Sequence, residues 1–132
     1  MGKTTRIAKA PETLAYTGFS PLVAAIIIGI KEKKGHDITV MNLKPTGTAL
    51  ADYFIICHGD SHTQVDALAR SVEDEVQAIT AERPEYKEGH LNAEWILLDY
   101  IHVVVHIFLK EQRDFYGIER FWADAETTNI MN

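Results

Sequence analysis

Apolar residues recur at helical spacing in the segment after Ser20. The stripe places its members on one side of a helix and consists of Leu22, Val23, Ile26, Ile27 and Ile30. Ser20 can cap the first turn, and Pro21 suits the first helical position, where its missing N–H would have no partner in any case. Gly35 is expected to end this helix in a left-handed conformation.

Two strands are predicted after this helix, over Asp37–Leu43 and Ala51–His58. The loop between them, Lys44–Thr48, contains the turn formers Pro45 and Gly47. The second strand is almost continuously apolar. Such a run predicts burial on both faces, as in the centre of a sheet covered by helices.

A second helix is predicted from Ser61, which has the spacing of a capping box with Gln64. Apolar residues then follow at intervals of three or four, at Val65, Leu68, Val72, Val76 and Ile79. A loop is expected over residues 81–93, where Pro, Gly and Asn interrupt the pattern.

The last third of the chain predicts two strands, Glu94–Leu98 and Val103–Leu109, and a final helix over Glu111–Trp122. The apolar side of this helix is expected to consist of Phe115, Ile118, Phe121 and Trp122. The connection between the strands is too short for a crossover, so they should pair antiparallel as a hairpin. The element order is then α-β-β-α-β-β-α. This order predicts an α/β fold in which helices flank a β-sheet.

The length of 132 residues is typical of one domain. We expect a flexible N-terminal arm over residues 1–18, a single domain over residues 19–126 and a C-terminal tail over residues 127–132. The arm mixes Lys, Thr, Pro and Gly without a sustained period, which is typical of an irregular segment.

The formal net charge is −6 at pH 7, which argues against nucleic acid as the primary partner and suits a basic protein. The single cysteine, Cys57, cannot form an internal disulfide, so a reducing, cytoplasmic location is expected. The longest apolar run, Leu22–Ile30, is too short to span a bilayer, and no membrane partner is expected.

No catalytic or metal site stands out among the titratable residues. The six histidines do not share the spacing of metal ligands, and His106 is interpreted as a buried, hydrogen-bonded residue. Cys57 lies in an apolar strand, where burial makes a thiol inert. The junction Gly59-Asp60-Ser61 could hold an anion, but the paired carboxylates of a magnesium-dependent transferase are missing. No cofactor is expected.

The predicted hairpin carries large apolar groups at or near its turn. Apolar residues at a solvent-facing turn cannot all be satisfied by the core, so Tyr100 and Ile101 are interpreted as an interaction surface. For Trp95, simple core packing is an equal alternative. Asp52 and Tyr53 would lie near them if the second strand neighbours the hairpin.

A series of segments in the same order resembles the Iojap family, the ribosomal silencing factors. The match covers about residues 20–125 and is carried by Ala51-Asp52-Tyr53-Phe54-Ile55-Ile56, Gly59-Asp60-Ser61-His62-Thr63-Gln64-Val65, Glu88-Gly89, Glu94-Trp95-Ile96-Leu97-Leu98-Asp99-Tyr100, Val103-Val104-Val105-His106-Ile107-Phe108, Arg113-Asp114-Phe115-Tyr116, Glu119 and Trp122-Ala123-Asp124-Ala125.

The resemblance implies an α/β fold with a mixed β-sheet, similar to nucleotidyltransferases, without known catalysis. It also implies binding to the large ribosomal subunit through its universal protein number fourteen, steric blocking of small-subunit joining, repression of translation and a tendency to dimerise. The family's docking residues correspond to Trp95 and Tyr100, and Asp99 and Ile101 follow by position. The family usually has Gly-Asp where this chain has Ile101-His102, so another residue must adopt the positive φ or the turn must differ.

Two alternatives stay open at this point. One is a nucleotidyltransferase-like, nucleotide-binding enzyme that uses Gly59–Ser61 for phosphate. The other is a homodimeric assembly module whose hairpin serves only self-association.

Overall fold

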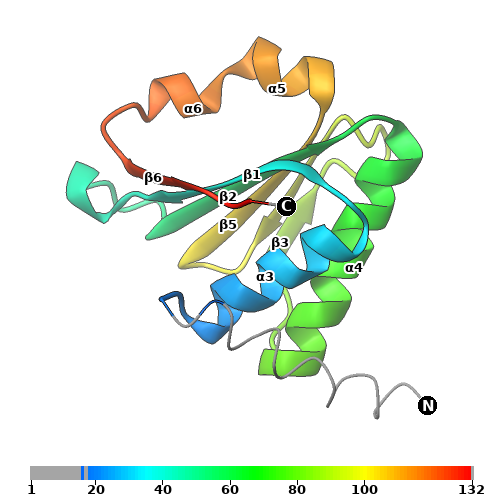
Figure 1. Ribbon diagram of the computed structural model, residues 1–132, viewed down its shortest axis with the longest axis horizontal. Coiled ribbons are helices and arrows are strands. Elements are labelled where there is room, and N and C mark those ends of the chain that lie inside the picture. Colours follow the sequence, from blue (N-terminus) through cyan, green and yellow to red (C-terminus); the bar gives the residue numbers. More distant parts are fainter. Residues whose placement is uncertain (1–15, 17, 132) are drawn as a thin grey trace.

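The computed structural model describes residue 16 and residues 18–131. Most of the predicted N-terminal arm therefore lies outside the described residues, as does the last residue of the predicted tail. The described chain forms a six-stranded sheet in the order β3-β4-β5-β2-β1-β6, with helices on both faces (Figure 1). The strands run both parallel and antiparallel to their neighbours. The α/β class with a mixed, helix-flanked sheet is confirmed.

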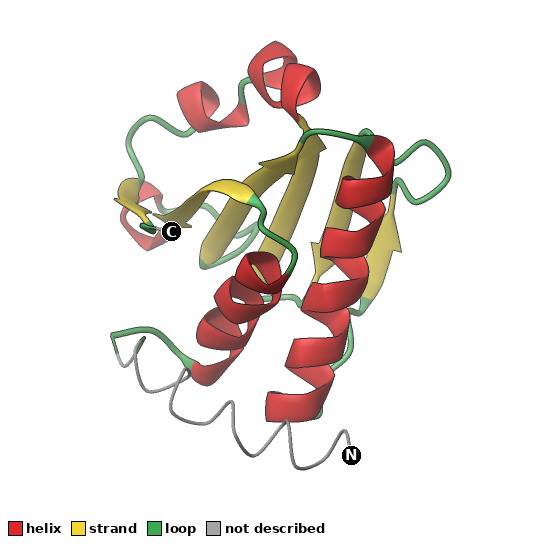
Figure 2. Cartoon of the chain, turned by 45° about the vertical axis from the view of Figure 1, so that its right-hand side comes forward, coloured by secondary structure: helices red, strands yellow, loops and turns green. Residues whose placement is uncertain are grey.

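Helices α3 (Pro21–Glu32) and α4 (His62–Thr80) lie side by side on one face of the sheet (Figure 2). As predicted, the Ser20 hydroxyl caps α3 and accepts a hydrogen bond from the Val23 N–H at 3.2 Å. The two helices approach most closely at Gly29, where a Cβ would come within 2.7 Å of the Val72 Cα. The Ser71 hydroxyl donates to the Gly29 carbonyl at 2.7 Å and fixes this approach.

The predicted role of Gly35 is wrong. Lys34, with φ of 60°, adopts the left-handed conformation that ends the helix region, and Gly35 does not. Gly35 is instead needed for space, because a Cβ there would come within 2.5 Å of the Ile30 Cγ2 and 3.0 Å of the Leu68 Cδ2.

The start of α4 follows the capping prediction in part. The Ser61 hydroxyl accepts from the Gln64 N–H at 3.1 Å. The Gln64 side chain, however, accepts from the N–H of Asp60 at 2.8 Å, one residue before the cap. Its amide nitrogen also donates to the carbonyls of Lys33 and Lys34. Gln64 therefore fastens the end of α3 to the start of α4.

The centre of the sheet is β2, which runs parallel to β5 and antiparallel to β1. Every residue of β2 after its first is buried, as predicted for a strand covered on both faces. A 3-10 turn, η1, lies between β1 and β2. The bounds are His36–Asn42 for β1, Lys44–Thr46 for η1, Tyr53–Gly59 for β2 and Val103–Leu109 for β5.

The predicted hairpin is confirmed, because β4 (Trp95–Asp99) pairs antiparallel with β5. The predicted element order is incomplete, since it lacks both edge strands. β3 (Tyr86–Glu88) lies in the segment expected as a loop and pairs with β4. β6 (Glu126–Asn129) overlaps the segment expected as a tail and pairs with β1.

The predicted single C-terminal helix is two short helices, α5 (Lys110–Tyr116) and α6 (Ile118–Phe121). Gly117, with φ of 57°, interrupts the helical backbone between them. Both helices lie on the sheet face opposite α3 and α4 (Figure 1). A second, smaller core fills this side and contains Met41, Leu43, Ala51, Phe54, Ile56, Val104 and Phe108.

Candidate protein-docking site

Strand alternation separates the residues predicted for docking. Trp95 packs against the smaller core beneath α5 and α6, whereas Tyr100 belongs to the larger core beneath α3 and α4. Tyr100 is only 5% exposed, so the expectation that its side chain faces solvent at the turn is wrong. The backbone explains this, because the Tyr100 N–H donates to the Val103 carbonyl at 2.8 Å and extends the hairpin pairing past β4. Tyr100 therefore keeps the alternation of the strand.

The turn itself is held in shape by Asp99. The Asp99 carboxylate accepts a hydrogen bond from the Ile101 N–H at 2.7 Å. Ile101 adopts φ of 76°, a conformation that glycine adopts more readily than other residues. Its side chain is 55% exposed, as the interpretation of an apolar turn tip requires.

Asp52 and Tyr53 lie beside this turn, as expected. Their N–H groups both donate to the His102 carbonyl, at 2.8 Å and 3.1 Å. The Asp52 carboxylate lies 3.7 Å from the His102 Nδ1, and the Lys44 ammonium lies 5.4 Å from the centre of the Tyr53 ring. The turn region, defined as Asp52, Tyr53 and Asp99–His102, thus joins an exposed isoleucine to two carboxylates.

Trp95 is half-buried in a cluster of rings. Its centroid lies 4.9 Å from that of Phe108 and 4.6 Å from that of Tyr116. Its indole N–H donates to the Nδ1 of His106 at 3.1 Å. Burial lowers the pKa of His106 to about 4, which keeps the imidazole neutral and able to accept this bond. The interpretation of His106 as a buried, hydrogen-bonded histidine is confirmed.

Sequence reasoning missed the aromatic surface that α5 and α6 add to Trp95. It assigned Phe115 and Phe121 to the apolar side of one helix, but they are 76% and 77% exposed. The break at Gly117 redirects the chain, and that glycine was the available signal that the helix is interrupted. We define the aromatic face as the rings that follow one another here: Phe54, Trp95, Phe108, Phe115, Tyr116, Phe121 and Trp122.

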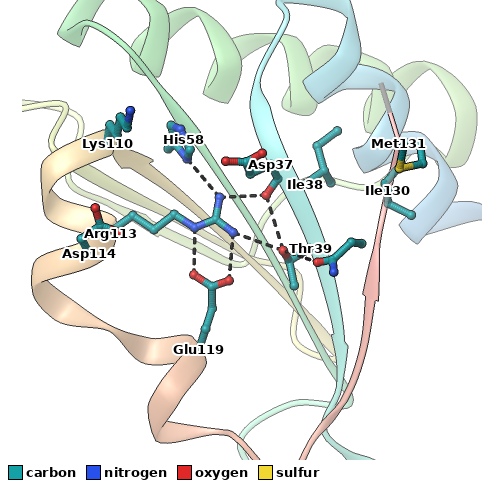
Figure 3. Close-up of a pocket in the computed structure, with 11 residues that line it drawn as sticks. Asp37, Ile38, Thr39, His58, Lys110, Arg113, Asp114, Glu119, Ile130 and Met131 are labelled. Atoms are coloured by element: carbon teal, nitrogen blue, oxygen red, sulfur yellow. Dashed lines mark hydrogen bonds and ion pairs between the residues drawn. The ribbon is translucent and has the colours of Figure 1, made fainter.

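Arg113 anchors α5 and α6 to the sheet (Figure 3). Its guanidinium donates two hydrogen bonds to the Glu119 carboxylate, at 2.8 Å and 2.9 Å. It also donates to the Asp37 carbonyl, the His58 Nδ1 and the Thr39 hydroxyl, at 2.8 Å, 3.1 Å and 3.1 Å. This bonding from Arg113 holds the pKa of Glu119 below its ordinary value.

A cavity of about 720 Å³ lies beside this arginine. Lys110 and His58 line it together with the carboxylates of Asp37, Asp114 and Glu119, so its wall has no dominant charge. Burial, and then the nearby Arg113 charge, lowers the pKa of His58. The Arg113 guanidinium donates its hydrogen bonds to other groups of the protein, so Arg113 acts as a structural link between the short helices and the sheet.

The Gly59–Ser61 junction is also occupied by bonds within the protein. The Asp60 N–H bonds to the Gln64 side chain and the Gln64 N–H bonds to the Ser61 hydroxyl, so these donors are engaged. Within residues 16 and 18–131, no group of three or more His, Cys, Asp or Glu side chains is placed to hold a metal ion. Cys57 is fully buried, and burial raises the pKa of its thiol to about 12, which keeps it unreactive. None of the helices in the described residues is long and apolar enough to cross a membrane.

Comparison with known proteins identifies the family. The protein-family model described as "Ribosomal silencing factor during starvation" matches residues 18–132. The chain belongs to the ribosomal silencing factor family. The silencing factor of Halalkalibacterium halodurans is 35% identical over 109 residues, which is 83% of this chain and 92% of that protein. The family's name describes a regulatory role rather than a catalytic one.

Relatives in plants and a solved structure extend the comparison. The chloroplastic protein Iojap of Arabidopsis thaliana is 35% identical over 95 residues, which cover 70% of this chain and 37% of that longer protein. A crystal structure of a protein from Chromobacterium violaceum has a TM-score of 0.73 and 32% identity, and the match covers 84% of this chain and 91% of that chain. The resemblance drawn from the sequence motifs is therefore confirmed.

Proposed function

We propose that this silencing factor binds the large ribosomal subunit through its universal protein number fourteen and sterically blocks association with the small subunit, repressing translation. The family membership supports a ribosomal role. The observation that carries the choice of mechanism is the half-buried Trp95 within a partly exposed aromatic face. Large aromatic side chains of this kind are the residues on which protein interfaces most often depend.

The proposed contacts are Trp95 from β4 and the exposed part of the turn region, with Asp52, Asp99 and Ile101 at its tip. Tyr53 and Tyr100 enter the proposal as supports, because their rings pack against the larger core behind the turn. The acidic groups suit a ribosomal protein, since such proteins are generally basic and are attracted by a negative surface. The net charge of −6 also disfavours bare RNA as the first contact.

Cosedimentation with purified large subunits tests the site. Trp95→Ala should weaken binding by about thirtyfold, because truncating a central interface tryptophan typically costs about 2 kcal/mol or more. Trp95→Phe preserves most of the ring packing and should bind better than Trp95→Ala. Leu91→Ala is the matched control, because Leu91 is fully exposed and lies in the loop between β3 and β4.

Circular dichroism must first establish that each variant is folded. If folded Trp95→Ala protein cosediments as well as wild type, the docking assignment is wrong. Tyr100→Ala should also weaken cosedimentation, through loss of support for the turn. Tyr100→Phe keeps that ring in the core and should bind like wild type.

A further inference from the structure

A series of ring contacts runs from α5, through the buried His106 and Phe54 of the sheet, to α6. Successive ring centroids lie 5.1 Å apart from Phe115 to Tyr116 and 4.6 Å from Tyr116 to Trp95. The series continues through His106, at 5.9 Å from Trp95, and reaches Phe54 after another 4.5 Å. From Phe54 it passes to Trp122 and Phe121, with steps of 6.0 Å and 5.2 Å. One array of rings thus connects three strands with both short helices.

The two ends of this array are the most exposed rings in it. Phe115 and Phe121 are 76% and 77% exposed, and Tyr116 is 50% exposed. Seven of the chain's twelve Phe, Tyr and Trp residues belong to the aromatic face. Phe54 and Phe108 are buried, so the exposed part of the aromatic face consists of Phe115, Tyr116 and Phe121 with the partly exposed Trp95 and Trp122. Such a group of exposed rings marks an interaction site rather than scattered surface residues. Arg113 holds the helices in place, so the rings are presented on a fixed support.

The charge around the face indicates what kind of partner it fits. Residues 110–126 contain five carboxylates and three basic side chains, and Arg113 is already paired with Glu119. On the β4 side, Glu88 borders the small cavity formed with Trp95 and Leu97. A second copy of the chain would bring a like net charge against this surface, whereas a basic protein would be attracted to it.

We infer that Phe115 and Phe121 form, with Trp95, an extended docking surface for a basic protein of the large ribosomal subunit. The inference rests on the proposed function and adds the two short helices to its site. The rings supply apolar contact area, and carboxylates of residues 110–126 meet basic side chains of the partner. Docking at α5 and α6 would enlarge the contact well beyond β4 and the turn region.

The first test is the double variant Phe115→Ala with Phe121→Ala, measured by cosedimentation with purified large subunits. Its affinity should fall by about tenfold or more, since interface aromatics are frequent hot spots. Both side chains are mostly exposed, so the fold should be retained. Leu91→Ala should bind like wild type. Unchanged binding by the double variant, alongside weakened binding by Trp95→Ala, would overturn this inference and leave the proposed function standing.

A charge pair tests the basic character of the partner. Phe115→Glu and Phe115→Lys both remove the ring, but only Phe115→Lys adds a charge that a basic partner repels. Binding should therefore be weaker for Phe115→Lys than for Phe115→Glu, and the difference should shrink at high salt. The reverse order would contradict a basic partner.

Sedimentation velocity of the free protein tests the alternative that the aromatic face binds a second copy of the chain. If the double variant converts a wild-type dimer into a monomer and still binds large subunits normally, the face serves self-association and the inference is wrong. If wild-type protein does not bind large subunits at all, the inference and the proposed function fail together.

Discussion

Ile101 holds a backbone conformation that a β-branched residue rarely adopts. Its φ of 76° is supported by the hydrogen bond from its N–H to Asp99 and by the pairing of Tyr100 with Val103. A left-handed conformation costs a non-glycine residue about 1–2 kcal/mol. The turn therefore stores strain at Ile101.

Ile101→Gly should raise the free energy of unfolding by about 1 kcal/mol, because glycine adopts the positive φ without the Cβ clash. Urea denaturation provides the measurement. Ile101→Ala is the control, since alanine keeps a Cβ and should gain less. A glycine variant less stable than wild type would show that the isoleucine is not strained. If the glycine variant is more stable and yet binds large subunits more weakly, the isoleucine side chain serves docking rather than folding.

His106 links stability to pH. Burial lowers its pKa to about 4, so the unfolded chain, with an ordinary histidine pKa of about 6.5, binds the proton more tightly. The contribution of His106 to the free energy of unfolding is therefore fully present above the pKa of the unfolded chain. It is lost as the pH falls toward the pKa of the folded protein. The expected loss from this residue between pH 7.5 and pH 5 is about 2 kcal/mol.

His106→Gln should flatten this pH dependence when unfolding is followed in urea at several pH values. His58 has a pKa lowered by burial and by Arg113, so it contributes in the same direction and some dependence should remain. A variant with the full wild-type loss on acidification would contradict the assignment to His106.

At the scale of elements, the contact of α3 with α4 depends on Gly29. A Cβ at this position would lie 2.7 Å from the Val72 Cα, a backbone atom that cannot rotate away. Gly29→Ala should therefore lower the free energy of unfolding by about 2 kcal/mol, despite the higher helix propensity of alanine. Thermal or urea denaturation measures this. Gly18→Ala is the control, because a Cβ there meets nothing within 4 Å. Equal stability of both variants would contradict the close-approach argument.

The attachment of α5 and α6 depends on Arg113. Arg113→Lys keeps a positive charge but cannot make the two-pronged contact with Glu119 or reach the same carbonyl and hydroxyl partners. We expect a loss of about 2 kcal/mol, because the buried acceptors on Thr39 and His58 would lose their donor. Hydrogen exchange should accelerate over residues 110–121 more than over α3.

Arg70→Lys is the matched control for Arg113. Arg70 forms an exposed ion pair with Asp66 on α4, and such pairs contribute about 0–1 kcal/mol. If both lysine variants are equally stable, Arg113 is not the anchor described above.

The elements with long apolar periods could be predicted from the sequence. α3, α4, β2 and the β4–β5 hairpin follow helical stripes, a continuous apolar run and a short connection. The edge strands β3 and β6 could not, because they have three and four residues that are all exposed and carry no hydrophobic pattern. Their pairing depends on neighbours that are distant in sequence.

The candidate site was predicted in part for similar reasons. The motifs identified Trp95 and the turn. Asp52 was expected near them only if the second predicted strand neighbours the hairpin, a condition that the pairing of β2 with β5 meets. The burial of Tyr100 depends on how β4 continues into the turn, which no local pattern reveals. The exposure of Phe115 and Phe121 depends on the break at Gly117, because an uninterrupted helix would have used one apolar side for the core.

At the scale of the whole molecule, the two sheet faces differ in character. One face is covered by the long helices α3 and α4 over the larger aliphatic core. The other carries two short helices, the aromatic face and a smaller core. With a net charge of −6, the molecule combines an apolar aromatic surface with a negative field. This combination supports the proposed docking to a basic protein.

The most direct measurement is light scattering during the association of purified large and small ribosomal subunits. Wild-type protein in excess over large subunits should reduce formation of the joined ribosome, and Trp95→Ala protein should reduce it much less. Leu91→Ala should act like wild type. Subunits that join as fast and as completely with excess wild-type protein as without it would contradict the proposed steric mechanism.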